Sequence, residues 1–156
     1  MKSLSILKTI FRTVMLSVVI SSAAHAADRG TAAEAEAMVK KAVAMVKSAG
    51  PEKAYDEFTN GKSFKDRDLY VFVYDLNGKN LAHGVNPKLV GKDLMGLKDP
   101  DGKPVVQMIV DLAKGKGKGW SESFKFLNPA SKTIEEKVIY LERVGDTLVG
   151  CGIYKS

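Results

Sequence analysis

The stretch YVFVYDLNGKNLAHG, residues 70–84, contains a strand, a turn and a returning strand. Aromatic and β-branched residues fill its first half, which favours a strand. Asn77-Gly78 is a strong hairpin signal, and we expect both turn residues to have positive φ. Because side chains alternate along a strand, Tyr70, Phe72 and Tyr74 share one face. The stretch therefore predicts an antiparallel hairpin that carries a row of aromatic rings.

The rest of the chain supplies helices before this hairpin and strands after it. Thr31 and Glu34 form a capping box for a long helix over 31–49, and Pro51 begins a short second helix. Expected elements further along are a long loop, a helix over 104–116 and strands over 117–126, 135–144 and 147–156. In the first of these strands, we expect Trp120, Glu122, Phe124 and Phe126 on one side. Hairpin connections dominate, so we predict an α+β domain with a five-stranded antiparallel sheet and helices packed on it.

The first 26 residues have the layout of a secretory signal peptide. Three basic residues precede the apolar run from Val14 to Ile20, and Ala24 and Ala26 fit an Ala-x-Ala cleavage site. The run is shorter than the roughly 20 residues that span a bilayer. We expect cleavage after Ala26, with an uncleaved anchor as the alternative, and a periplasmic product over 27–156 without a further membrane span.

Charge and cysteine content exclude several classes of function. The chain has 24 basic and 18 acidic residues. Since residues 1–26 hold three basic and no acidic ones, the mature net charge is +3, and nucleic acid is not an expected partner. Cys151 is the only cysteine and lies in an apolar segment, so we expect a small buried side chain, with a reactive thiol as the alternative. No spacing typical of a structural zinc or haem site is present, and no cofactor is expected.

Two glycine-rich loops could hold a ligand, but simpler structures account for both. KDPDG (98–102) has two aspartates but lacks the other ligands of a calcium loop, so a turn is favoured over a metal site. KGKGKGW (114–120) lacks the spacing of a phosphate-binding loop, and we interpret it as a solvated connection.

A pocket over the aromatic face is the best candidate for a functional site. His83 lies just past the hairpin and has no nucleophile to serve, so we do not expect an enzyme. Lys137 lies among apolar residues and must either extend to solvent or find a partner, for which an anionic ligand would suffice. Strict alternation places Lys137 and Tyr140 on opposite faces unless a bulge intervenes. Rings that merely fill the core remain the alternative.

Linked motifs extend over residues 31–154. They are the aromatic strand ending in Asp75-x-x-Gly78, a histidine near the end of the next strand, Val90-Gly91-Lys92, Asp101-Gly102, Gly119-Trp120, Lys137 with Tyr140, and Gly152-Ile153-Tyr154. This set resembles the single Cache domain, type 2, an extracytoplasmic sensing module of bacterial chemoreceptors and sensor kinases. The resemblance implies a PAS-like fold in which a long N-terminal helix lies along the sheet. It also implies a pocket for a small organic acid, with the ligand-binding residues Phe72, Tyr74, His83, Trp120, Lys137 and Tyr140.

Two functions therefore remain open. The first is a stand-alone periplasmic domain for sensing or binding a small organic anion such as a short carboxylate, with a membrane receptor or kinase as a partner. The second is an interaction module without a ligand, acting as a homodimer or as a subunit of a membrane receptor or transporter.

Overall fold

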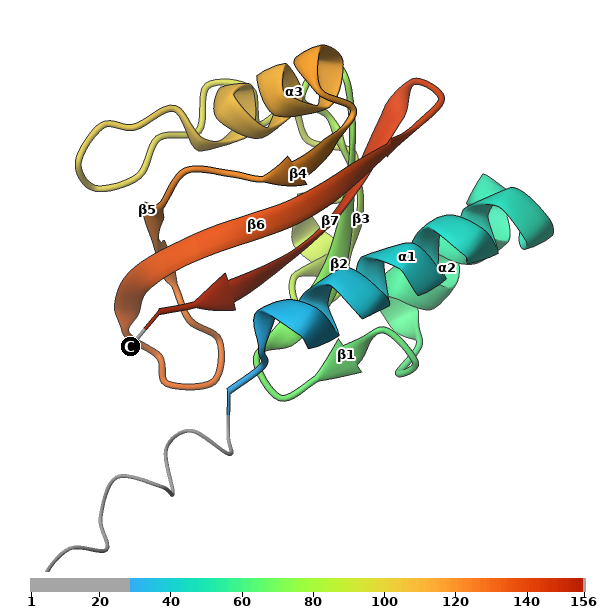
Figure 1. Cartoon of the computed structure of the whole chain (residues 1–156), viewed down its shortest axis with the longest axis horizontal. Coiled ribbons are helices and arrows are strands. Elements are labelled where there is room, and N and C mark those ends of the chain that lie inside the picture. The colour runs from blue at the N-terminus through green and yellow to red at the C-terminus, as the bar shows by residue number, and fades with distance from the viewer. Residues whose placement is uncertain (1–28, 156) are drawn as a thin grey trace, which may run out of the picture.

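An antiparallel sheet with helices on both faces is the framework of the protein (Figure 1). The computed structural model describes residues 29–155, so the predicted signal peptide lies outside the described residues. The helices are α1 (Ala32–Ala49), α2 (Pro51–Asn60), the 3-10 turn η1 (Pro87–Leu89) and α3 (Val105–Gly115). The strands are β1 (Lys65–Asp66), β2 (Leu69–Asp75), β3 (Asn80–His83), β4 (Lys118–Trp120), β5 (Phe124–Leu127), β6 (Ile134–Val144) and β7 (Thr147–Tyr154).

The sheet confirms the predicted α+β class. Its strand order is β1-β2-β7-β6-β4, with β3 also pairing with β2 and β5 also pairing with β6. The short strands β1 and β3 thus follow one edge of the sheet, and β4 and β5 follow the other. The seven strands occupy the five positions expected from the sequence, because each edge position is divided between two short strands.

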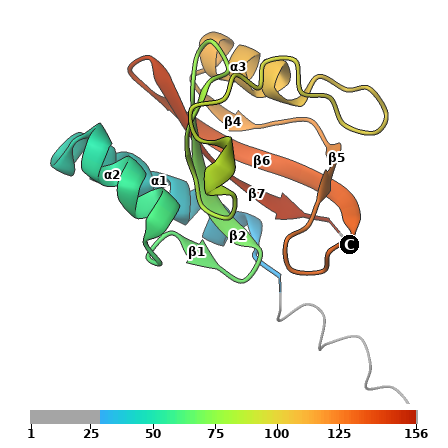
Figure 2. The ribbon, with the colours of Figure 1, turned by 180° about the vertical axis from the view of Figure 1, so that it is seen from behind.

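The two faces of the sheet carry different layers. Helices α1 and α2 lie together on one face, and α3 crosses the other (Figures 1 and 2). The α1 face buries small and β-branched residues of α1, such as Ala35 and Val39, against Val71 and Val149 of the sheet. The α3 face buries the aromatic row of β2 against α3, through Val105 and Ile109. The functional site therefore has to be sought between α3 and the sheet, where the rings and polar groups meet.

The predicted ends of α1 and α2 are confirmed. The Thr31 side chain accepts a hydrogen bond from the Glu34 backbone N–H, and the Glu34 carboxylate accepts one from the Thr31 backbone N–H at 2.8 Å. Gly50 separates the helices with φ of 85°, and Pro51 is the first residue of α2. No helix among residues 29–155 combines the length and apolar character that crossing a membrane requires.

The β2–β3 hairpin forms, but its turn differs from the predicted one. Gly78 has φ of 85°, whereas Asn77 is not among the residues with positive φ, so the expectation for Asn77 is wrong. The Asp75 carboxylate fixes the turn instead, because its Oδ1 accepts hydrogen bonds from the backbone N–H groups of Asn77 and Lys79, both at 2.9 Å. A register shift between Val73 and Tyr74 then places His83 opposite Phe72.

The strand expected over 117–126 is interrupted, and the interruption changes which face each side chain occupies. Trp120 pairs with Tyr140, and Phe124 pairs with Lys137. Trp120 and Phe124 are four positions apart in the chain, but their partners on β6 are only three positions apart. Since paired residues point to the same face of a sheet, Trp120 and Phe124 lie on opposite faces. The prediction that they share a side is therefore wrong.

Candidate functional site

A small cavity lies between α3 and the sheet, and we call it the α3-face cavity. Its sheet side is formed by the three aromatic residues of β2 together with His83 and Lys137. Because Tyr70, Phe72 and Tyr74 alternate with Val71 and Val73, the sequence itself turns the rings to this face and the valines to α1.

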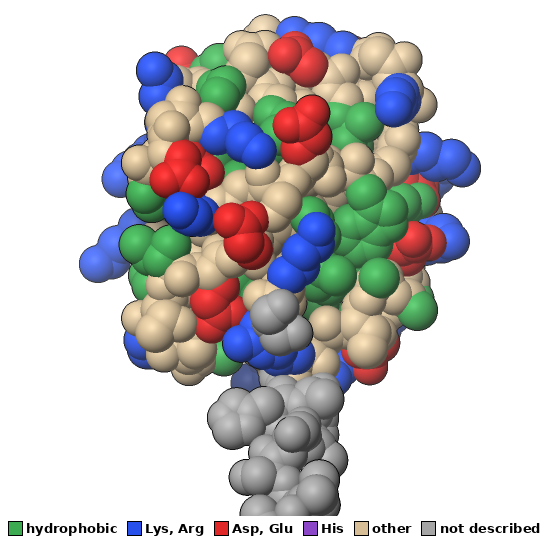
Figure 3. Space-filling view, turned by 60° about the vertical axis from the view of Figure 1, so that its left-hand side comes forward, with side chains coloured by type: hydrophobic (Ala, Val, Ile, Leu, Met, Phe, Trp, Pro, Cys, Tyr) green, Lys and Arg blue, Asp and Glu red, His purple; other side chains and the backbone are tan. Residues whose placement is uncertain are grey.

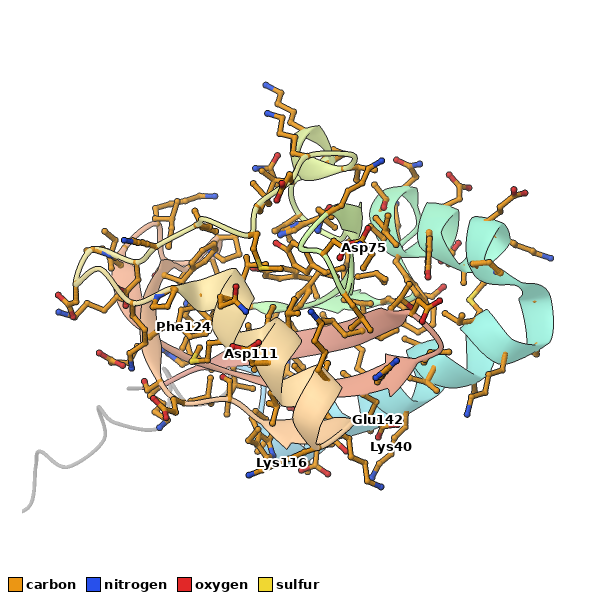
Figure 4. The ribbon with its side chains drawn as sticks, turned by 90° about the horizontal axis from the view of Figure 1, so that it is seen from above. Lys40, Asp75, Asp111, Lys116, Phe124 and Glu142 are labelled. Atoms are coloured by element: carbon orange, nitrogen blue, oxygen red, sulfur yellow. The ribbon has the colours of Figure 1, made fainter. Side chains whose placement is uncertain are left out.

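The opposite wall of the α3-face cavity is apolar. Val105, Val106 and Ile109 come from α3, and Leu97 comes from the loop before it. Phe124 and Phe126 of β5 close one side, and Figure 4 shows Phe124 near α3 when the sheet is viewed from the helix side. The free volume is about 30 Å³, so the cavity has room for one or two water molecules.

Lys137 is the most unusual group in the cavity. Its side chain is 2% exposed, and its Nζ donates hydrogen bonds to the hydroxyl oxygens of Tyr70 at 2.7 Å and Tyr154 at 3.0 Å. The Nζ also lies 4.5 Å from the ring centroids of both tyrosines and 5.2 Å from that of Phe126. These rings stabilise a cation. Within residues 29–155, however, no carboxylate forms a salt bridge with Lys137.

Burial without a paired anion perturbs the ionisation of this group. Desolvation lowers the pKa of Lys137 to about 7, and the Cys151 and Asp68 side chains offset only part of this effect. Burial also raises the pKa of the Tyr70 and Tyr154 hydroxyls well above the ordinary value. The two phenols therefore remain neutral at pH 7 and can act as hydrogen-bond donors or acceptors. The site consequently presents one positive charge, or one neutral amine, in an aromatic enclosure.

His83 supplies a second polar group with a defined tautomer. Its Nδ1 accepts hydrogen bonds from the backbone N–H groups of Val85 at 3.4 Å and Asn86 at 3.1 Å. A nitrogen that accepts in this way carries no proton, so the neutral ring bears its proton on Nε2. Desolvation, together with the charge of Lys137, lowers the pKa of His83 to about 4. At neutral pH, His83 is thus a donor to the cavity and not a second cation.

Two glycines of β7 make room for these side chains. A Cβ added at Gly152 would lie 2.2 Å from Cε of Lys137, and one at Gly150 would lie 2.5 Å from the Phe72 ring. The aliphatic part of Lys137 therefore rests directly on the β7 backbone. Gly152 thereby allows Nζ to reach both phenols instead of extending away from the sheet.

Four of the six predicted site residues line the cavity, and two lie elsewhere. Phe72, Tyr74, His83 and Lys137 are on the α3 face. Tyr140 is part of the α1-face core, and Trp120 packs against it with the ring centroids 5.5 Å apart. The expectation that these two residues line the same pocket is wrong, because the β6–β7 register is regular and strict alternation holds.

Trp120 and Tyr140 have another structural role. The Trp120 Nε1–H donates to the Glu36 carboxylate of α1 at 3.0 Å, and the Tyr140 hydroxyl donates to Glu142 at 2.9 Å. The Trp120 contact attaches α1 to the far edge of the sheet, whereas the Tyr140 contact lies within β6.

The prediction of the site missed Tyr70 and Tyr154 as polar groups. Tyr70 is in the same alternating row as Phe72, so its face was foreseeable from the sequence. The position of Tyr154 depends on β7 pairing with β6, which places it opposite Lys137. The two-residue turn signal Gly145-Asp146 between these strands could have indicated this pairing.

The other residues that the sequence analysis considered for ligand or metal binding have structural roles. Among residues 29–155, no group of three or more His, Cys, Asp or Glu side chains could hold a metal ion. In KDPDG, Oδ1 of Asp99 accepts hydrogen bonds from the backbone N–H groups of Asp101 and Lys103, which makes a turn. Cys151 is buried, and burial raises the pKa of its thiol to about 12, so it is a packing residue.

Comparisons with known proteins agree with this architecture. The sequence model of the single Cache domain 2 family matches residues 8–156. The chain is 31% identical over 91 residues to the methyl-accepting chemotaxis protein McpP of Pseudomonas putida, and 30% identical over 90 residues to the sensor histidine kinase MctS of Rhizobium johnstonii. These alignments cover 57% and 56% of this chain but only 16% and 19% of the relatives, so the chain spans less than a fifth of either protein.

Solved structures show the same fold. A methyl-accepting chemotaxis protein from Vibrio parahaemolyticus superimposes with a TM-score of 0.66 at 28% identity, covering 78% of this chain and 86% of that one. A second structure, described as the structural basis for carboxylic acid recognition by a Cache chemosensory domain, superimposes with a TM-score of 0.63 at 24% identity and the same coverage.

Proposed function

The chain belongs to the single Cache domain 2 family, and from this premise we propose that it binds a short carboxylate in the α3-face cavity. One observation carries the proposal. The ammonium group of Lys137 is buried and donates hydrogen bonds to two phenol oxygens. It has no carboxylate partner among the described residues. A buried charge without a counter-ion is costly. A ligand carboxylate would supply the missing charge, and the cation would fix its orientation.

The neighbouring groups suit the two oxygens of a carboxylate. One oxygen can accept from Lys137, while the other can accept from the Nε2–H of His83 or the hydroxyl of Tyr70. The His83 and Tyr70 rings are 5.1 Å apart between centroids, so the donors converge on one region. The apolar wall from α3 then receives the alkyl part of the acid.

The free volume sets the size of the ligand. Because only about 30 Å³ is open, a two- or three-carbon acid requires small side-chain movements, and a longer acid requires α3 or β5 to move. We therefore propose that affinity falls as the acid becomes longer. The solved Cache domain described for carboxylic acid recognition supports this class of ligand by analogy of fold.

The biological role proposed here is sensing outside the cytoplasm. McpP and MctS are a chemotaxis receptor and a sensor kinase. We propose that the domain is periplasmic, that it has no enzymatic activity, and that a membrane receptor or kinase detects its ligand-bound form. N-terminal sequencing of the exported protein tests the location and the cleavage after Ala26.

Titration calorimetry tests the ligand class. Formate, acetate, propionate, butyrate and succinate are titrated into the wild type, into Lys137→Ala and into Lys88→Ala. Lys88 is an exposed lysine of η1 and serves as the control. We expect a short monocarboxylate to bind the wild type and the control equally. Its binding to Lys137→Ala should be weaker by roughly 2–5 kcal/mol, since the variant lacks the buried charge. Equal binding of every acid to all three proteins would refute the site.

A further inference from the structure

A second depression lies against the outer side of β5, and we call it the outer hollow. Its volume is about 160 Å³, and its lining includes Lys98, Lys125, Leu127 and Ile134. Phe126 lines both the outer hollow and the α3-face cavity. One ring therefore stands between a surface depression and the buried ammonium, whose Nζ is 5.2 Å from the ring centroid.

The backbone around this ring is fixed. The carboxylate of Asp99 is 9% exposed, and its Oδ2 accepts a hydrogen bond from the Lys125 backbone N–H at 3.0 Å. Its other oxygen accepts from the backbone N–H groups of Asp101 and Lys103. These bonds lower the pKa of Asp99, and the bond from the Lys125 backbone N–H contributes the most. The loop before α3 is thereby attached to β5, so the outer hollow has a rigid frame.

The Phe126 ring is held less firmly than its frame. The side chain is only partly buried, and the four-residue strand β5 pairs with β6 along one edge alone in the part of the chain that the structure describes. Its aromatic neighbour is Phe124, whose ring lies edge-on with a centroid distance of 6.1 Å. Rotation of a partly exposed side chain is fast and leaves the backbone bonds intact. Such a rotation would connect the outer hollow with the α3-face cavity.

The charges at the outer hollow favour anions. Lys98 and Lys125 flank it, and the one acidic residue in its lining, Asp99, directs its oxygens at backbone N–H groups. Lys125 also pairs with the exposed Asp101 at 2.9 Å, which moderates the local field. Figure 3, which brings the side of the molecule bearing β5 forward, shows basic and acidic side chains interspersed there. The individual charges of Lys98 and Lys125, and not a large positive surface potential, would therefore guide the anion.

We infer that Phe126 is the gate through which small anions pass from the outer hollow to Lys137. The identity of the anion rests on the proposed function, whereas the route itself does not. Opening requires the Phe126 ring to turn away from Lys137, and closure restores its contact with the cation and separates the cavity from solvent.

Chemical labelling of Lys137 tests the route without any ligand. Formaldehyde with dimethylamine–borane methylates neutral amines, and peptide mass mapping follows each lysine separately. In Phe126→Ala, we expect Lys137 to be methylated about tenfold faster than in the wild type, because local opening no longer limits access. In Phe126→Trp, the larger ring should slow the reaction. The exposed Lys47 and Lys88 provide internal reference rates in every sample.

Two further variants separate a gate from a loosened core. Met108→Ala removes a side chain of the same apolar cluster that lines neither hollow, and it should react like the wild type. Phe124→Ala removes a ring that lines only the α3-face cavity, and it should have a smaller effect than Phe126→Ala. Equal acceleration in Phe124→Ala and Phe126→Ala, or no acceleration in Phe126→Ala, would overturn the gate. If Phe126→Ala does not fold, as judged by circular dichroism, Phe126→Trp decides the matter by slower or unchanged labelling.

Stopped-flow binding of the best carboxylate separates this inference from the proposed function. A gate predicts that the association and dissociation rates of Phe126→Ala both rise by about tenfold while Kd changes much less. If labelling accelerates but no carboxylate binds the wild type, the route stands and the ligand class fails. If a carboxylate binds but neither labelling nor rates respond to Phe126, the gate fails and the ligand class stands.

Discussion

The Nζ of Lys137 lies 2.7 Å from the hydroxyl oxygen of Tyr70, a residue 67 positions earlier in the chain. This contact joins β6 to β2 across the intervening strand β7. It places the charged end of a lysine over the centre of a sheet, where solvent cannot reach it. The expected consequences concern the stability, pH dependence and ligand binding of the protein.

Replacing Lys137 with methionine should stabilise the ligand-free protein. Methionine keeps a similar length and removes the desolvated charge, which in other buried sites leaves stability unchanged or raises it by about 1–4 kcal/mol. We therefore expect Lys137→Met to have an equal or greater free energy of unfolding at pH 6, measured by urea denaturation, while carboxylate binding is lost. Lys88→Met, at an exposed position, is the matched control. A variant less stable than the wild type by more than 2 kcal/mol would show that the charge is well compensated without a ligand.

The stabilising effect of Lys137→Met should depend on pH. The pKa of Lys137 is about 7 in the folded protein and 10.5 in its reference state. Between these values the unfolded chain binds more protons than the folded one, so the stability of the wild type increases with pH relative to the variant. The difference in unfolding free energy between the two proteins should change by about 1.4 kcal/mol per pH unit. Denaturation of both proteins at pH 6, 7, 8 and 9 measures this difference, and a constant difference over the series would contradict the low pKa.

Carboxylate binding should show the opposite dependence on pH. A bound carboxylate favours the protonated amine, so above pH 7 the protein must take up a proton when it binds. Affinity should then fall by up to about tenfold per pH unit. Calorimetry at pH 8 in phosphate and in Tris measures the proton directly, because the two buffers release protons with different enthalpies. Identical binding enthalpies in both buffers would exclude proton uptake.

The sequence predicted most of the fold because its local signals agreed with one another. The capping box at Thr31, the proline at position 51 and the alternating rings of β2 each act over a few residues, and each formed as expected. The hairpin turn differed because the Asp75 carboxylate, and not a second residue with positive φ, satisfies its backbone.

The lining of the α3-face cavity was predicted only in part because it depends on register. One additional residue between β4 and β5 sends Trp120 to the α1 face, although Phe124 remains on the α3 face. No periodicity in 117–126 signals this interruption. The position of Tyr154 beside Lys137 also depends on register, but here the turn signal Gly145-Asp146 between β6 and β7 would have indicated the pairing.

Adding one methyl group at Gly152 should disturb the site more than the fold. The new Cβ would lie 2.2 Å from Cε of Lys137, so the lysine must leave its place over β7. We expect Gly152→Ala to lose about 1–3 kcal/mol of stability and to bind carboxylates more weakly than the wild type. Gly115→Ala is the control, because a Cβ there meets no atom within 4 Å. Combining Gly152→Ala with Lys137→Ala should restore stability, and a double variant no more stable than Gly152→Ala would place the clash elsewhere.

Removing a tyrosine hydroxyl should affect ligand binding on the α3 face of the sheet but not on the α1 face. The Tyr140 hydroxyl contacts Glu142 beside α1, whereas the Tyr154 hydroxyl accepts from Lys137 and donates to the Leu127 carbonyl at 2.9 Å. Tyr140→Phe removes one hydrogen bond and Tyr154→Phe removes two, each worth about 0.5–1.5 kcal/mol of stability. Only Tyr154→Phe also changes the surroundings of the cation, so it alone should alter carboxylate affinity and its pH dependence. Calorimetry on both variants at pH 6.5 and 8.5 makes the comparison. An altered affinity in Tyr140→Phe with none in Tyr154→Phe would place the ligand on the α1 face of the sheet.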